Sequence, residues 1–288
     1  MKTIDNNWKV LSKLFNPGLN EILYQQYFAA QFIAMTGRHL IKQRQDDSNT
    51  SMVFNPHTLS LVGELLSGDL RTSLNLSDLS LALLRDDSPL PSIISLPGLD
   101  MKSALSLLRQ GLDNAGIKGD NLIYKLHYDL PDHKLLKGSL FFYDQPELIS
   151  ENIAYRHNAE IVLNEIISQF KQAESVRIWP HHFDTGTLIP LKHGPGGELA
   201  MSVGLGWAIP DGMVDEPYYY LSIWSSDTVE FPTPLQPLII GNWRMPAWNG
   251  AVLKLSEIIN YRTAEEQYEC VLSFFKSGIE IVQGFIKP

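Results

Sequence analysis

A histidine and an aspartate stand two positions apart in the segment Arg177-Ile-Trp-Pro-His-His-Phe-Asp-Thr-Gly186. Successive side chains of a β-strand point to opposite faces, so a strand here would place His182 and Asp184 together on one face. Such a pair can supply two ligands of a divalent metal ion, or the carboxylate can orient the imidazole as a general base. The spacing therefore predicts a metal site or a catalytic pair at His182 and Asp184.

Either chemistry needs a third polar group, and the candidates are Glu216, Tyr219, Asp211 and His193. The alternative is a structural histidine, because buried polar side chains need hydrogen-bond partners whether or not they do chemistry. The zinc patterns H-E-x-x-H and Cys-x-x-Cys are absent. The residues leave both interpretations open.

Aromatic side chains concentrate in the same region, since five of the six tryptophans lie between residues 176 and 250. Their flat faces can stack on rings or hold a cation, or can simply pack in a core. The region carries seven acidic and three basic residues, which favours a neutral or cationic ligand over a phosphate. We predict a pocket lined by Trp179, His182, Asp184, Trp207, Glu216 and Tyr219.

Three other features of the sequence do not match the functional sites that they partly resemble. Gly204-Leu-Gly206 is followed by Ile209 where a dinucleotide fingerprint needs a third glycine. Ser202 precedes a strand and turn rather than the helix that follows a nucleophile elbow. Cys270 lies in an apolar helical pattern without a neighbouring histidine, which is typical of a packed residue.

The segments Val176 to Asp184, Val203 to Trp207 and Glu216 to Leu221 resemble an uncharacterised bacterial domain-of-unknown-function family. That family has a long helix, an aromatic-rich box ending in Phe-Asp, a glycine-containing strand and a Tyr-rich strand. Phe183 and Asp184 match its box. The resemblance implies a fold and a location for the site, but no activity.

Helices and strands alternate in blocks along the chain. Pro17 and a capping aspartate, Asp100, begin helices that run toward Leu40 and Gly116. Asp144-Gln-Pro-Glu147 begins a long amphipathic helix to about Gln172, and a capping box at Thr263 begins the last helix. Strands are predicted within 51–85, at 121–130 and 135–143, and at 176–190, 198–207 and 216–224.

This order predicts an α+β fold, a mainly antiparallel sheet with flanking helices. Asn55-Pro-His57 follows the first long helix as Trp179-Pro-His181 follows the second, which raises the alternative of two similar helix-plus-sheet halves, about 16–145 and 146–288. No linker separates them, so a single compact unit over 1–288 is the simpler expectation.

Composition narrows the classes of partner. The 288 residues carry a net charge of −9, the wrong sign for binding phosphate backbones or anionic lipid, so no nucleic acid or membrane partner is expected. One cysteine and polar residues near the N-terminus favour a cytoplasmic location.

Two functions follow as hypotheses. The first is a small-molecule binding protein or enzyme with its pocket around the Trp-Pro-His-His-Phe-Asp segment, with or without a divalent metal ion. The second is a non-enzymatic protein-interaction or homodimerising module that uses the aromatic and Pro-rich segment 231–248.

Overall fold

A computed structural model describes residues 7–226 and 235–285. They form five α-helices and twelve mostly short strands, which confirms the predicted α+β fold with a mainly antiparallel sheet and flanking helices. No helix within the described ranges is long and apolar enough to cross a membrane. The chain divides into two compact units.

The N-terminal unit comprises residues 17–153 and 177–183, and the C-terminal unit comprises the described parts of 1–16, 154–176 and 184–288. Helix α3, Pro146–Ile167, begins in the first unit and ends in the second. The boundary near residue 153 lies close to the division between the two similar halves predicted from the sequence. Whether the halves are a duplication stays a prediction.

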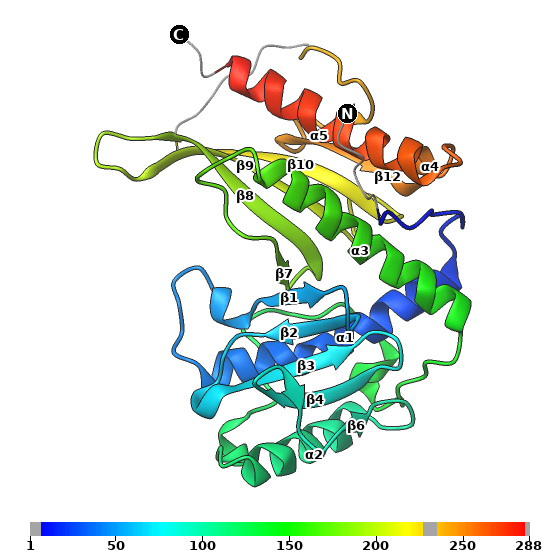
Figure 1. The fold of residues 1–288 in the computed structure, drawn as a ribbon, viewed down its shortest axis with the longest axis vertical. Helices are drawn as coiled ribbons and strands as arrows, with labels where there is room; N and C mark the ends of the chain where they lie inside the picture. The colour runs from blue at the N-terminus through cyan, green and yellow to red at the C-terminus, as the bar shows by residue number, and fades with distance from the viewer. Residues whose placement is uncertain (1–6, 227–234, 286–288) are drawn as a thin grey trace. The chain divides into compact units, whose positions relative to one another are not determined.

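Figure 1 shows the N-terminal unit as a sheet with the long helix α1 behind it. Its strands follow the order β7-β1-β2-β3-β4-β5, and β6 also pairs with β4. The strand and helix bounds are β1 Met52–Asn55, β2 Ser60–Gly63, β3 Leu70–Asn75, β4 Ser80–Arg85, β5 Ser88–Pro89, β6 Ile94–Ser95, β7 Arg177–Trp179, α1 Pro17–Leu40 and α2 Met101–Asn114.

The C-terminal unit has the strand order β8-β9-β10-β12-β11, with α5 packed on the sheet. The bounds are β8 Asp184–His193, β9 Leu199–Ala208, β10 Tyr218–Ser225, β11 Asn242–Trp243, β12 Gly250–Lys254, α4 Leu255–Ile258 and α5 Ala264–Gly284.

Helices α2 and α5 begin at the residues that the sequence predicts, because capping signals are local. The Asp100 carboxylate accepts a hydrogen bond from the Ser103 amide at 2.8 Å and caps α2. Thr263 and Glu266 form the expected reciprocal capping box of α5. Helix α3 ends at Ile167, five residues before its predicted end, where the chain turns tightly.

The predicted strands at 121–130 and 135–143 are wrong. This stretch contains only short 3₁₀ helices, at Gly119–Asn121 and Lys134–Lys137, and one isolated bridge between Pro97 and Phe141. Several of its polar groups bond to side chains of α1 instead of to a neighbouring strand. The Lys125 carbonyl lies 2.8 Å from His39 Nε2, and the Phe142 amide donates to Gln25 Oε1 at 3.2 Å.

Candidate functional site

The predicted strand 176–190 is broken by a turn at residues 180–183. Phe183 has a φ of 54°, in the left-handed region that few residues other than glycine adopt. The extended backbone that would place His182 and Asp184 on one strand face is therefore absent, and that part of the prediction is wrong. His182 belongs to the N-terminal unit and Asp184 begins β8 of the C-terminal unit.

Side chains of helix α1 bond to the backbone of this turn. The Tyr27 hydroxyl donates to the His181 carbonyl at 2.7 Å, and Gln31 Nε2 donates to the Pro180 carbonyl at 3.1 Å. The Phe183 ring stacks on Tyr27 with 5.4 Å between ring centroids. Residues four apart lie on the same face of a helix, so Tyr27 and Gln31 can hold the turn together.

The hairpin between β1 and β2 has a matching turn, in which Leu59 has a φ of 52° and follows Pro56-His57. There the Asn55 side chain accepts hydrogen bonds from the His57 and Thr58 amides. Trp179 occupies the corresponding position before Pro180 and has no such oxygen, and α1 supplies the side chains that hold that turn.

Both histidines of the turn are exposed, with ring centroids 4.5 Å apart. Trp179 is half-buried and lies edge-on to His181 at 6.3 Å. Within residues 7–226 and 235–285, no group of three or more His, Cys, Asp or Glu side chains is arranged to hold a metal ion. The metal ion stays a hypothesis from the sequence.

Asp184 is buried and accepts a hydrogen bond from the Tyr220 hydroxyl at 2.5 Å. The Tyr220 ring lies over Gly186 and Gly206, where an added Cβ would approach its atoms to 2.7 Å and 2.4 Å. Burial and the neighbouring Asp184 carboxylate raise the pKa of Tyr220 well above its ordinary value. Two glycines therefore make the room through which this tyrosine reaches the aspartate.

Trp207 and Tyr219 are directly opposite each other in the sheet and both are buried. Trp207 packs under the Arg156 guanidinium, 5.1 Å from the ring centroid, and Tyr219 meets Phe275 of α5 edge-on at 5.9 Å. The structure thus places these two predicted ligand-binding side chains in the core of the C-terminal unit. The strand alternation puts Tyr220 on the opposite face.

Arg156 is only 1% exposed and donates to Thr185 Oγ1 at 2.6 Å. Burial lowers its pKa from 12.5 to about 9, while the negative charges of Asp184 and Glu160 act in the opposite direction. The arginine therefore remains charged at neutral pH, and Asp184 belongs to its electrostatic environment.

Glu216, the remaining predicted ligand-binding residue, accepts hydrogen bonds from the Ser256 amide at 2.7 Å and the Ser256 hydroxyl at 2.9 Å. Lys254 lies 3.7 Å away. These contacts tie the segment just before β10 to the first turn of α4. Cys270 is buried as predicted, and burial raises the pKa of its thiol to about 12.

Comparison with protein-family models, curated proteins and solved structures finds no match. The family resemblance therefore stays a prediction.

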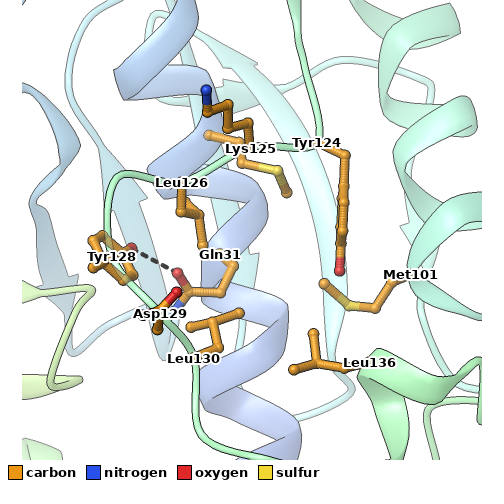
Figure 2. A pocket seen from close by; sticks show the side chains of 10 residues that line it. Gln31, Met101, Tyr124, Lys125, Leu126, Tyr128, Asp129, Leu130 and Leu136 are labelled. Atoms are coloured by element: carbon orange, nitrogen blue, oxygen red, sulfur yellow. Dashed lines mark hydrogen bonds between the residues drawn. The ribbon is translucent and has the colours of Figure 1, made fainter.

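The N-terminal unit contains a pocket of about 380 Å³ beside α1. Residues of α1, of α2 and of the segment 124–136 line it, and Figure 2 shows their side chains. The lining residues are Gln31, Met35, Met101, Tyr124, Lys125, Leu126, Tyr128, Asp129, Leu130 and Leu136. None of them is among the site residues predicted from the sequence. We call this cavity the α1 pocket.

Gln31 connects the α1 pocket to the Trp-Pro-His-His-Phe-Asp segment. Its side chain is fully buried and lines the pocket. Its Oε1 accepts a hydrogen bond from the Tyr128 hydroxyl at 2.7 Å, and its Nε2 donates to the Pro180 carbonyl. The Tyr128 and His181 rings also lie 6.0 Å apart. The predicted segment is therefore next to the pocket wall, although it does not line the cavity.

The sequence carries a signal for this pocket in the glutamines that interrupt the most apolar helix. Gln25, Gln26 and Gln31 are all buried. Because a buried amide needs partners, their presence in an apolar helix indicates a polar segment packed against it. That segment is 121–143, which bonds to all three glutamines.

The aromatic and Pro-rich segment 231–248 falls partly outside the described residues, because 231–234 are not described. In the part that is described, Ile239 is 77% exposed, and Trp243 Nε1 donates to the Gln236 carbonyl at 3.0 Å. A single exposed apolar side chain is normal on a protein surface. The interaction-module hypothesis stays a prediction.

Proposed function

We propose that this protein binds a small, largely apolar organic molecule in the α1 pocket. The observation that carries the proposal is the pocket itself, whose 380 Å³ falls in the range of about 300–1,000 Å³ typical of ligand sites. Most of its lining is apolar or aromatic, with only a few polar side chains. Such a lining binds chiefly by burying apolar ligand surface.

The contacts that fix the pocket wall support the same proposal. The segment 124–136 is attached to α1 by the hydrogen bond from the Tyr128 hydroxyl to Gln31 and by the hydrogen bond between the Lys125 carbonyl and His39. It is attached again at its far end, where His133 stacks on Phe28 with 5.0 Å between centroids. A wall held at several points is preorganised, which reduces the entropy lost when a ligand binds.

The neutral fluorophore N-phenyl-1-naphthylamine, which brightens in apolar surroundings, tests this proposal. We expect saturable binding of one molecule per chain. Replacing Leu130, which lines the pocket, by tryptophan should fill the cavity and weaken binding about tenfold or more, a loss of roughly 1.4 kcal/mol. Equilibrium fluorescence titration measures both affinities.

The matched control is Val53→Trp, which adds the same ring to an exposed position of β1 outside the pocket lining. It should bind the fluorophore within about twofold of the original chain, because that difference is only about 0.4 kcal/mol. The proposal would be contradicted if both substitutions weakened fluorophore binding equally, or if neither weakened it.

Three further features are part of the proposal and rest on the sequence alone. They are a cytoplasmic location, a neutral or cationic ligand, and the lack of a nucleic-acid partner. The single cysteine supports the location, the seven acidic against three basic residues of 176–250 support the ligand charge, and the net charge of −9 supports the lack of a nucleic-acid partner.

A further inference from the structure

The polar groups of the α1 pocket differ in whether they are already used. The Gln31 amide bonds to Tyr27, Tyr128 and the Pro180 carbonyl, and the Tyr128 hydroxyl donates to Gln31. The Tyr124 hydroxyl has no hydrogen-bond partner anywhere in residues 7–226 and 235–285. It is therefore the lining hydroxyl that has both its donor and its acceptor capacity available.

Tyr124 is also placed to meet a ligand. Figure 2 shows its hydroxyl end pointing toward Met101 and Leu136, across the pocket from Gln31 and Leu130. The side chain is 44% exposed, so it stands where the pocket opens to solvent. Partial burial raises the pKa of Tyr124, and the hydroxyl is neutral at physiological pH.

Charge and side-chain chemistry restrict the ligand further. The lining contains one basic and one acidic residue, Lys125 and Asp129, so it has no net preference for an ion. Two thioethers, Met35 and Met101, line the same cavity. Sulfur makes favourable contacts with aromatic rings, and methionine adapts to the shape of a planar group.

We propose that Tyr124 determines the specificity of the α1 pocket, and that the ligand is a neutral aromatic molecule with one hydroxyl or N–H group that bonds to the Tyr124 hydroxyl. The aromatic ring of the ligand would then lie against Met101 and Leu136. This inference rests on the proposed function, since it assigns a ligand class to that same pocket.

Two probes of nearly equal shape test the inference, 2-naphthol and 2-methylnaphthalene, which differ by a hydroxyl in place of a methyl group. Each is titrated against bound N-phenyl-1-naphthylamine. Tyr124→Phe removes one oxygen atom that bonds to no described residue, so the fold should be unaffected. We expect this substitution to weaken 2-naphthol binding about three- to tenfold, the effect of one hydrogen bond, and to leave 2-methylnaphthalene binding within about twofold.

Tyr24→Phe serves as the matched control, because Tyr24 lies on α1 outside the lining and stacks on His133. It should change neither affinity. Equal effects of Tyr124→Phe on both probes would overturn the assignment of Tyr124 while leaving the pocket as a binding site. Failure of the fluorophore itself to bind the original chain would instead overturn the proposed function.

Discussion

Replacing Arg156 by methionine is expected to lower the free energy of unfolding by about 3–5 kcal/mol, one of the largest losses that a single substitution should cause here. Methionine keeps much of the length of the side chain but removes its charge. The substitution removes the hydrogen bond to Thr185 and the favourable electrostatic interaction between the buried Arg156 and Asp184. Urea unfolding followed by tryptophan fluorescence measures the loss.

A second substitution separates the charge from the packing. Asp184→Asn removes the negative charge and keeps an oxygen that can accept the hydrogen bond from Tyr220. If Arg156 stabilises the fold by compensating Asp184, the double variant should be more stable than the sum of the two single losses predicts. Strict additivity, or a loss below about 1 kcal/mol for Arg156→Met, would contradict this account.

Gln31→Leu is expected to lower stability by about 2–4 kcal/mol and to loosen the pocket wall at the same time. Leucine has a similar volume but leaves the Tyr128 hydroxyl and the Pro180 carbonyl without their partner, and unsatisfied buried groups cost about 1–3 kcal/mol each. Hydrogen–deuterium exchange should rise in two segments distant in sequence, 124–130 and 180–183. The same substitution should also weaken the binding of N-phenyl-1-naphthylamine, because the pocket wall is less well held.

The control for this prediction is Gln45→Leu, since Gln45 is exposed and lies outside the pocket lining. It should leave stability and exchange unchanged. Faster exchange in only one of the two segments after Gln31→Leu would show that Gln31 does not couple the pocket wall to the turn.

Elements with local signals could be predicted from the sequence. Pro17, Asp100 and Thr263 begin helices at the predicted residues, because a cap acts within one helical turn. The hairpins of 51–85 also follow from alternation and turn residues. Each of these signals is read within a few residues of the structure it specifies.

The segment 121–143 could not be predicted in this way, because its hydrogen bonds go to α1, about a hundred positions earlier in the chain. Its apolar alternation looks like a strand, while its partners are helix side chains. The α1 pocket depends on this same packing. Strand patterns therefore gave no indication of it, and the buried glutamines of α1 were the available signal.

The turn at 180–183 is an intermediate case. Its resemblance to Asn55-Pro-His57 was visible in the sequence, and Leu59 and Phe183 adopt the same left-handed backbone. The residues on either side of the turn are extended, in β7 and β8, so the pattern of the whole stretch predicts one continuous strand. The turn itself separates His182 from Asp184.

The central claim is that the α1 pocket holds a small apolar ligand, and methionine methyl groups offer the most direct test. In protein labelled with ¹³C at the methionine methyls, two of the seven methionines, Met35 and Met101, line the pocket. Titration with N-phenyl-1-naphthylamine should shift the resonances of these two through the ring current of the ligand, with a common dissociation constant. Met201 and Met213, which lie in the C-terminal unit, should not move. Saturable binding that shifts Met201 or Met213 and leaves Met35 and Met101 unchanged would place the ligand elsewhere and contradict the account.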